Sequence, residues 1–259
     1  GGPDSEVFYD FGADLQLHEN SLWKDEPCHV NCDCGRFLEI GNSVFMQYQK
    51  QPDGSFTDLP QKNVDFGGGL ERIAAAANGD SDVFKTAAFT ESIAEIEKVT
   101  GQKYGGEHTA EMRVIADHLK AAVFLIKDGV LPSNKAQGYF LRRLIRRATV
   151  KLHQMGSGLN PATLVTIADL GVLATYDGVY FDRTQDRELI DRVLVDEGSK
   201  FTKSLEKGLK TLEKQAHIDG RFAFDLYQTY GFPLEITLEL AAQKGQQVDV
   251  EVFKQEFAK

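Results

Sequence analysis

The sequence predicts an α+β fold that is mostly α, with an antiparallel sheet in the first eighty residues and helices in the rest. Two observations lead to this prediction. Short runs of aromatic and β-branched residues, separated by turns that contain glycine, fill the first eighty residues, as expected of strands. After Asn78-Gly79-Asp80, apolar residues recur at helical spacing. We therefore expect one domain over residues 1–80 and a helical domain over residues 81–259.

Composition limits the class of protein. A chain of 259 residues can form two domains, and it contains no run of eighteen apolar residues and no signal-peptide pattern at its start. The formal net charge of −10 argues against a protein that coats long nucleic acid, so any nucleic-acid contact should be local. The three clustered cysteines make a poor disulfide framework and indicate a reducing compartment. We expect a soluble, cytoplasmic protein with no membrane partner and no DNA partner.

Strands are predicted over residues 6–9, 36–40 and 43–48. Gln51-Pro52-Asp53-Gly54 is a turn signal, because glycine can take a positive φ angle. The strand before this turn should therefore return as one arm of a hairpin.

Residues 63–76 predict a strand that runs through three glycines into an alanine-rich helix. Consecutive glycines let the backbone approach a ligand closely, and Arg72 adds positive charge to the N-terminal end of the helix dipole. This arrangement suits a polyphosphate. The alternative is a tight strand-to-helix turn with a structural ion pair between Glu71 and Arg72. Neither a Walker lysine nor spaced Rossmann glycines are present.

The helical half is expected to contain helices near residues 89–99, 113–127, 134–148, 187–215 and 222–230. Gly101 is placed to cap the first of these. The helix over 187–215 should be long, exposed and amphipathic, with Gly198 and Gly208 weakening it locally. Gly231 should end the helix before it, and Pro233 can open another.

The helix over residues 134–148 is basic and is preceded by Pro132-Ser133. Its arginines are Arg142, Arg143, Arg146 and Arg147. Their spacing places them in one stripe above apolar residues, and rigid guanidiniums can hold phosphates. The alternative is an ordinary solvated helix face.

Cys28, His29, Cys32 and Cys34 offer four zinc ligands in one loop. Their spacing is not that of a standard zinc finger, and neighbouring ligands strain tetrahedral geometry. The alternative is a reduced, partly buried loop. We therefore assign no metal ligand, and keep Zn²⁺ only as a candidate cofactor at Cys28, Cys32 and Cys34.

Gly67 to Arg72, leading into a helix, resembles the third signature of class II aminoacyl-tRNA synthetases. Further blocks resemble the alanyl-tRNA synthetase family, in family order across nearly the whole chain. These blocks are Val64-Asp65, Arg113–His118, Asp128–Asn134, Gly138–Ala148 and Thr229–Pro233. The resemblance identifies residues 1–80 as the end of a class II catalytic domain and 81–259 as a helical tRNA-recognition domain.

The resemblance implies activation of alanine with ATP and Mg²⁺, followed by transfer of alanine to tRNA(Ala). It implies that Asp65 holds the α-ammonium of alanine and that Arg72 stabilises ATP phosphate charge, which makes both catalytic. Asn42, Asp65, Gly67 and Gly69 would bind substrate, Gly69 and Arg72 would bind ATP, and Glu39 would assist with magnesium. Gly41, Phe66 and Gly68 depart from the family, which usually has tryptophan, threonine and methionine at these positions.

For tRNA, the resemblance implies that Asn134 reads a G·U wobble pair in the acceptor stem. Arg142, Arg143, Arg146 and Arg147 would contact the nearby backbone. Gln228 stands where the family often has aspartate; an amide can both donate and accept, so Gln228 is either a tRNA contact or purely structural.

The first two class II signatures would precede Gly1, and editing and assembly regions would follow Lys259. The resemblance therefore implies an internal fragment that is inactive alone. Two alternatives stay open. One is a non-catalytic tRNA-binding module derived from a synthetase, and the other is a class II synthetase that activates serine or glycine.

Overall fold

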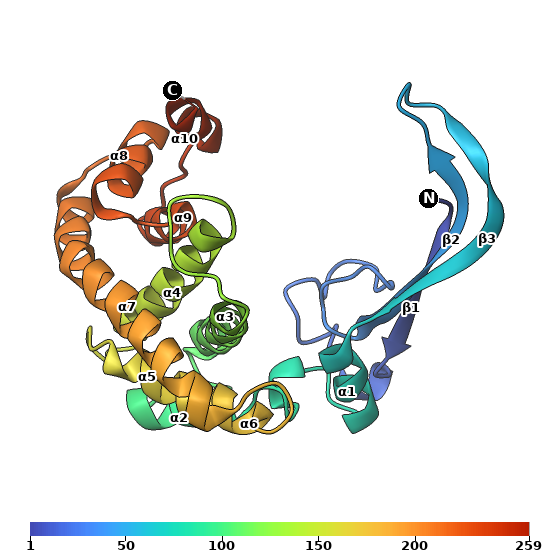
Figure 1. Cartoon of the computed structure of the whole chain (residues 1–259), viewed down its shortest axis with the longest axis horizontal. Coiled ribbons are helices and arrows are strands. Elements are labelled where there is room, and N and C mark those ends of the chain that lie inside the picture. The colour runs from blue at the N-terminus through green and yellow to red at the C-terminus, as the bar shows by residue number, and fades with distance from the viewer. Residues whose placement is uncertain (259) are drawn as a thin grey trace. The chain divides into compact units, whose positions relative to one another are not determined.

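The computed structural model describes residues 1–258, which divide into two compact units. The first unit is Gly1–Ala88 and the second begins at Phe89. Figure 1 shows that strands lie in the first unit and that the second is built of helices. The predicted α+β class, mostly α, is confirmed.

The first unit contains a three-stranded antiparallel sheet in the order β1-β2-β3. Its strands are β1 (Asp4–Asp10), β2 (Phe37–Lys50) and β3 (Phe56–Gly68). The segments predicted as two strands are one strand, because Gly41 and Asn42 keep their pairing with both neighbours. Figure 1 shows β2 and β3 as one long, curved hairpin.

The predicted hairpin turn is confirmed. The backbone N–H of Gln51 donates to the carbonyl of Ser55 at 2.8 Å, and Gly54 takes a φ of 87°. Asp53 supports the turn by accepting from the backbone N–H and the hydroxyl of Ser55. After the sheet come α1 (Leu70–Asn78) and the short 3-10 turn η2 (Val83–Lys85); η1 (Ala13–Leu15) lies between β1 and β2.

The second unit is helical. Its elements are α2 (Thr90–Thr100), α3 (Thr109–Lys127), α4 (Ala136–Gln154), α5 (Ala162–Ile167), the π-helical segment η3 (Ala168–Leu173), α6 (Ala174–Tyr176), α7 (Arg183–Lys214), α8 (Gly220–Tyr230), α9 (Leu234–Gln243) and α10 (Val250–Phe257). Helix α3 carries a fully buried face that includes Ile115, Leu119 and Ile126, so it is central to this unit. Gly231 ends α8 with a left-handed φ, and α9 starts directly after Pro233, as predicted.

Helix α7 differs from its prediction. It is long and amphipathic, as predicted, but it is continuous over 32 residues, and its buried face includes Gly198 and Gly208, so the expected local weakening at these glycines is not seen. A Cβ at Gly198 would lie 3.2 Å from Leu164, and one at Gly208 would lie 2.3 Å from the ring of Phe232. The glycines therefore allow close packing of α7 against α5 and against Phe232, and this packing offsets their low helix propensity.

A second hydrophobic core forms around the middle of α7. The rings of Phe201 and Phe232 are both fully buried and meet edge to face, 6.1 Å apart. Leu205, Leu226 and Ile236 belong to the same cluster, which joins α7, α8 and α9. Among the residues that the structure describes, no helix has the length and apolar character needed to cross a membrane.

Candidate functional site

One face of the sheet gathers the predicted substrate-binding residues. Asn42 on β2 is paired with Gly67 on β3, and Val44 is paired with Asp65. Residues opposite each other on neighbouring strands share a face, so Asn42, Asp65 and Gly67 lie together. A Cβ at residue 67 would lie 3.3 Å from Oδ1 of Asn42. Glycine at this position therefore leaves the Asn42 amide accessible beside the Asp65 carboxylate.

A β-bulge brings Glu39 to the same face. Phe8 is paired with Glu39 and Val7 with Gly41, which leaves Ile40 as an extra residue on β2. Such a bulge shifts the alternation of side chains by one residue. Without it, Glu39 would point to the opposite face from Asn42.

Arg72 lies in the first turn of α1 and reaches back to β2. Its Nη1 donates to the backbone carbonyl of Glu39 at 3.1 Å and lies 3.4 Å from Oε2 of the same residue. The N–H of Gly69 donates to the carbonyl of Ile40 at 3.0 Å, and a Cβ at Gly69 would lie 3.1 Å from Cδ of Arg72. The glycine thus lets the arginine fold closely over the start of the helix. Half of the Arg72 side chain stays exposed.

On the other face of the sheet, Phe66 packs over Gly41 and Gly68. Two ring atoms of Phe66 lie 3.0 Å from the position of a Cβ at Gly41, and another lies 3.2 Å from that of Gly68. The sequence resemblance places tryptophan at position 41 and threonine at position 66. This chain therefore carries its aromatic ring on β3 instead of β2, and the ring covers the glycines.

This exchange predicts a coupled effect on stability. We expect Gly41→Trp to destabilise the protein by roughly 1–3 kcal/mol, because its side chain collides with Phe66. Gly41→Trp combined with Phe66→Thr should recover part of the loss, since the Gly67 carbonyl oxygen, 2.9 Å from the same Cβ position, still restricts it. Denaturant unfolding of the two single variants and the double variant measures the coupling. Strictly additive losses would contradict the exchange.

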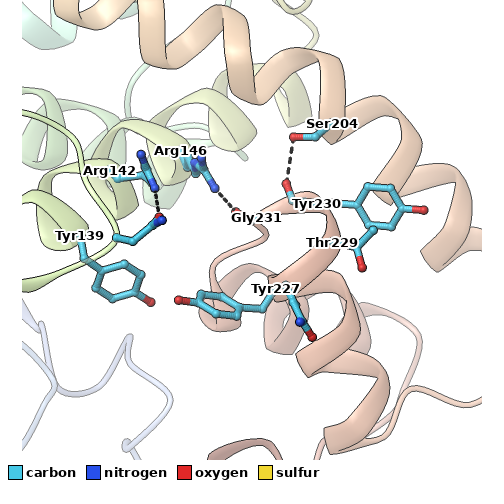
Figure 2. Close-up of a pocket in the computed structure, with 10 residues that line it drawn as sticks. Tyr139, Arg142, Arg146, Ser204, Tyr227, Thr229, Tyr230 and Gly231 are labelled. Carbon is cyan, nitrogen blue, oxygen red and sulfur yellow. Dashed lines mark hydrogen bonds between the residues drawn. The ribbon is translucent and has the colours of Figure 1, made fainter. Parts of the chain in front are cut away.

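The second candidate site is a cavity of about 420 Å³ between α4, α7 and α8 (Figure 2). It is lined by Asn134, Tyr139, Arg142, Arg146, Ser204, Tyr227, Gln228, Thr229, Tyr230 and Gly231. The structure thus brings together four residues predicted to contact tRNA: Asn134, Arg142, Arg146 and Gln228.

Asn134 is held at the mouth of this cavity by the turn before α4. Gly138, in the first turn of α4, lets the helix pack against this turn, because a Cβ there would lie 2.3 Å from Oγ of Ser133 and 2.5 Å from the carbonyl of Leu131. The N–H of Ser133 donates to the carbonyl of Gly138 at 3.1 Å, and its hydroxyl donates to the carbonyl of Lys135 at 2.9 Å. Arg142 donates to Oδ1 of Asn134. Because Arg142 occupies one lone pair of the Asn134 oxygen, the NH₂ group with its two donors is the better placed part of the amide to contact a ligand.

Arg146 is a structural brace. Its Nε donates to the carboxylate of Glu197 on α7 at 2.8 Å, and its Nη1 donates to the carbonyl of Gly231 at 2.8 Å. The guanidinium also lies over the ring of Phe201, 5.0 Å from its centroid. Burial lowers the pKa of Arg146, while the charge of Glu197 opposes that shift. A side chain at Gly231 would displace the Arg146 guanidinium, because a Cβ would lie 1.9 Å from its Nη1, and the φ of 69° there favours glycine.

The other arginines of the stripe are also paired within the chain. Arg142 lies 3.3 Å from the buried Glu197, Arg143 lies 3.0 Å from Glu235, and Arg147 lies 3.5 Å from Glu239. The sequence predicted four cationic groups facing a ligand. The structure instead shows that acidic residues of α7 and α9, distant in sequence, compensate their charge. Only Arg142 and Arg146 reach the cavity that contains Asn134.

Sequence reasoning missed two tyrosines of the cavity. The hydroxyl groups of Tyr139 and Tyr227 point toward each other in Figure 2. Burial and the hydrogen bond with Tyr227 raise the pKa of Tyr139 to about 12. Tyr139 therefore stays neutral at physiological pH. The two phenols form a polar wall beside Gln228. The available signal was that Tyr139 lies in the block Gly138–Ala148 and that Tyr227 directly precedes Gln228.

In the loop that carries Cys28, Cys32 and Cys34, the histidine near the sulfur atoms is not the predicted one. His18 lies among the cysteines, and His29 does not; Nδ1 of His29 instead accepts from the N–H of Asn31 at 3.1 Å. His18 was missed because it precedes Cys28 by ten residues, a separation that matches no standard zinc motif.

The glycine-rich strand end and the arginine at the start of α1 are the features by which the sequence resembles class II aminoacyl-tRNA synthetases. The family model of tRNA synthetases class II (A) matches residues 1–259, and the chain belongs to this family.

Curated relatives are alanine–tRNA ligases. The protein from Thermotoga petrophila is 42% identical over 257 residues, which covers 97% of this chain and 29% of the relative. The protein from Anaeromyxobacter sp. is 37% identical over 284 residues, covering 99% of this chain and 31% of the relative. The protein from Caldicellulosiruptor saccharolyticus is 41% identical over 264 residues, covering 96% of the chain and 28% of the relative. The resemblance predicted from the sequence is confirmed, and the chain spans less than a third of these relatives' length.

Proposed function

We propose that this chain is part of an alanine–tRNA ligase, which activates alanine with ATP and transfers it to tRNA(Ala). The observation that carries the proposal is the match of almost the whole chain to alanine–tRNA ligases from several bacteria. In this proposal, the first unit contributes part of the aminoacylation site and the second unit contributes tRNA recognition.

Alanine would bind on the sheet face that carries Asn42 and Asp65. The Asp65 carboxylate is suited to the α-ammonium group, because a charge-assisted hydrogen bond is stronger than a neutral one. Asn42 is paired with Gly67, two residues after Asp65 on β3, and its amide offers a donor and an acceptor. Gly67 has no side chain to cover this surface, so a small amino acid can approach the backbone.

ATP would bind where β3 meets α1. Arg72 is held in place by an exposed ion pair with Glu39 at 3.4 Å, and such pairs contribute only about 0–1 kcal/mol. Phosphate oxygens can therefore replace the carboxylate at little cost and accept a two-pronged contact from the guanidinium. Mg²⁺, when bound with ATP, would neutralise phosphate charge, and Glu39 is the carboxylate placed to hold it beside Arg72. Catalysis would rest on positioning and on charge stabilisation.

The acceptor stem of tRNA would dock at the cavity beside α4. A G·U pair exposes its edges in the wide minor groove of A-form RNA, where a short side chain can reach them. The NH₂ group of Asn134 supplies a donor, and the amide of Gln228 can supply either a donor or an acceptor. Arg142, Arg143 and Arg147 would contact the backbone, and Arg146 would act chiefly by bracing the cavity.

Pyrophosphate exchange driven by different amino acids tests the proposed activity. We expect the full-length gene product to exchange pyrophosphate into ATP with alanine and to show far weaker exchange with serine or glycine. A preference for serine or glycine would contradict the assignment. Binding of tRNA without exchange for any amino acid would instead identify a non-catalytic tRNA-binding module.

Selective binding of the wobble pair tests the helical unit. We expect this chain to bind an alanine acceptor-stem hairpin carrying G·U more tightly than the same hairpin carrying G·C, at fixed near-physiological salt. Asn134→Ala should remove the preference, because it deletes a hydrogen bond worth about 0.5–1.5 kcal/mol, or roughly 2- to 13-fold in affinity. Fluorescence anisotropy measures both hairpins. Asn63→Ala, in an exposed part of β3, is the matched control.

Two outcomes would contradict this role. Equal binding of the two hairpins by the unchanged chain would remove Asn134 as the reader. A preference that survives in Asn134→Ala would assign discrimination to Gln228 or to other residues of the cavity.

A further inference from the structure

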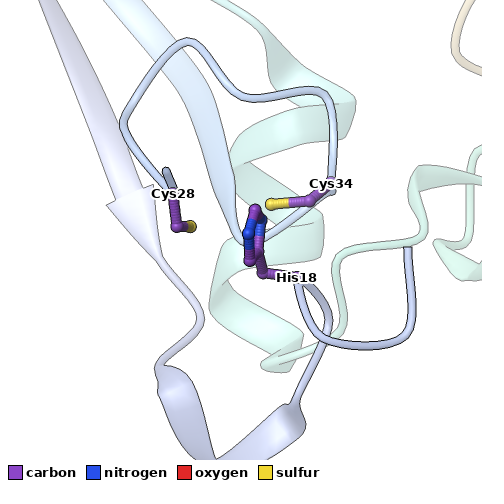
Figure 3. Close-up of side chains that lie close together, drawn as sticks. All are labelled: His18, Cys28 and Cys34. Atoms are coloured by element: carbon purple, nitrogen blue, oxygen red, sulfur yellow. The ribbon is translucent and has the colours of Figure 1, made fainter. Parts of the chain in front are cut away.

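The loop between β1 and β2 brings four metal-binding side chains together. Nδ1 or Nε2 of His18 and the sulfurs of Cys28 and Cys34 all lie within 4.8 Å of one another. Sγ of Cys32 lies 3.5 Å from Nδ1 of His18. Figure 3 shows the side chains of Cys28 and Cys34 directed toward the His18 ring. In a tetrahedral zinc site with Zn–S bonds of about 2.3 Å and Zn–N bonds of about 2.0 Å, the ligand atoms are roughly 3.5–3.8 Å apart.

The histidine is already oriented as a metal ligand. Nε2 of His18 lies 2.9 Å from the carbonyl oxygen of Glu26. A carbonyl oxygen can only accept, so Nε2 carries the proton and Nδ1 keeps a free lone pair. That lone pair faces the sulfur of Cys32. Histidines that bind zinc are oriented in the same way, with the other ring nitrogen donating to a carbonyl or a carboxylate.

The surrounding loop lacks an apolar core that could order it. Residues 11–36 contain only the short turn η1 as regular structure, and loops longer than about 12–15 residues without such structure are uncommon in compact domains. The apolar side chains of Leu15, Leu22 and Val30 are 50%, 92% and 46% exposed, whereas His18 is only 7% exposed. The centre of the loop is therefore the polar cluster itself.

The base of the loop is closed. Arg36 donates from Nε and Nη2 to the two carboxylate oxygens of Asp10 at 2.8 and 2.9 Å. The N–H of Phe11 donates to the carbonyl of Arg36 at 3.0 Å. With both ends tied to the sheet, a metal held by the cluster would need to order only the interior of the loop.

We propose that His18, Cys28, Cys32 and Cys34 form a structural Zn²⁺ site that stabilises this loop. Four protein ligands fill a tetrahedral zinc site and leave no open position, so the ion serves the fold and does not activate water. Binding exchanges three thiol protons for one zinc ion, and the proton on Nε2 of His18 stays in place. This proposal is independent of the ligase function.

Metal analysis of the whole chain tests the site. We expect about one zinc ion per chain after purification without chelator, measured by plasma mass spectrometry, in keeping with a closed four-ligand site. Replacement of zinc by Co²⁺ should give the visible bands of tetrahedral cobalt and the near-ultraviolet band of thiolate-to-cobalt charge transfer. Cobalt binding to the unchanged chain is informative even if a variant does not fold.

Substitutions identify the ligands. His18→Ala and Cys34→Ser should lose the metal and lower the thermal unfolding temperature of the first unit. The matched control is His29→Ala, because His29 adjoins Cys28 but does not face the cluster; it should keep one zinc ion. Absence of zinc from the unchanged chain after incubation with zinc chloride would overturn the proposal. So would full metal content in His18→Ala, or a disulfide in the freshly purified protein.

Discussion

Arg72→Ala in the full-length gene product is expected to abolish detectable alanine-dependent pyrophosphate exchange. In the proposed site, the Arg72 guanidinium meets the phosphate charge that develops as alanine attacks ATP. Removal of a single preorganised donor to such charge costs about 10²–10³ in rate, and loss of a full positive charge should cost at least as much. Stopped or continuous exchange assays with saturating alanine and ATP measure the effect.

The fold should survive this change, which separates catalysis from stability. Arg72 is half exposed, and its pair with Glu39 is an exposed one, so its loss should move the free energy of unfolding by less than about 1 kcal/mol. Arg72→Lys should recover a small part of the exchange rate, because lysine keeps the charge and loses the two-pronged geometry.

Arg221→Ala is the matched control for Arg72→Ala. Arg221 is an exposed arginine on α8 whose partner, Glu256, lies at a similar distance of 3.4 Å. This variant should exchange pyrophosphate at the normal rate. Full exchange in Arg72→Ala would show that the glycine-rich turn is only a structural connection.

The local elements were predictable because their signals are local. Gln51-Pro52-Asp53-Gly54 specifies its own turn, and Gly231 with Pro233 specifies both the end of one helix and the start of the next. The two glycines of α7 misled the prediction for the same reason. Propensity describes an isolated helix, whereas Gly198 and Gly208 lie where other side chains approach most closely.

The candidate sites were predictable only as sets of residues. Spacing along a helix places the arginines of α4 in a row, but it does not show that Glu197 and Glu235 come from other helices to pair with them. Likewise, the cluster of cysteines is visible in the sequence. Its histidine, His18, is not, because it reaches the cysteines only through the fold of the loop, which buries it. In both cases the missing information is a contact between distant segments, which periodicity does not carry.

Glu197 should be among the most sensitive positions of the helical unit. Its carboxylate is almost fully buried, and it lies 2.7 Å from Nη2 of Arg146 and 3.3 Å from Nε of Arg142. Removal of one partner from a buried ion pair typically costs about 3–5 kcal/mol, because the remaining charge is left without compensation. Glu197→Ala leaves the guanidiniums of Arg142 and Arg146 close together without the carboxylate that compensates their charge. We therefore expect a loss of about 3–5 kcal/mol in chemical denaturation of the chain, by the same reasoning.

Glu206→Ala is the control for this loss, because Glu206 is exposed on the same helix. It should change the free energy of unfolding by no more than about 0.5 kcal/mol, as surface substitutions usually do. Equal stabilities of the two variants would mean that α4 and α7 are held together by apolar packing alone, and that the ion pairs contribute nothing.

Glu197→Gln links this stability to RNA recognition. The amide keeps the size of the side chain and can still accept from Arg146, so the fold should be less affected than in Glu197→Ala. The charge of Arg142, however, would no longer be compensated, and Arg142 is the residue that orients Asn134. We expect both hairpins to bind more tightly and with a steeper salt dependence, since one more cation faces the phosphates. The ratio of G·U to G·C affinity should fall, because an arginine drawn toward phosphate releases the oxygen of Asn134. An unchanged ratio with unchanged salt dependence would show that Arg142 neither positions Asn134 nor meets RNA.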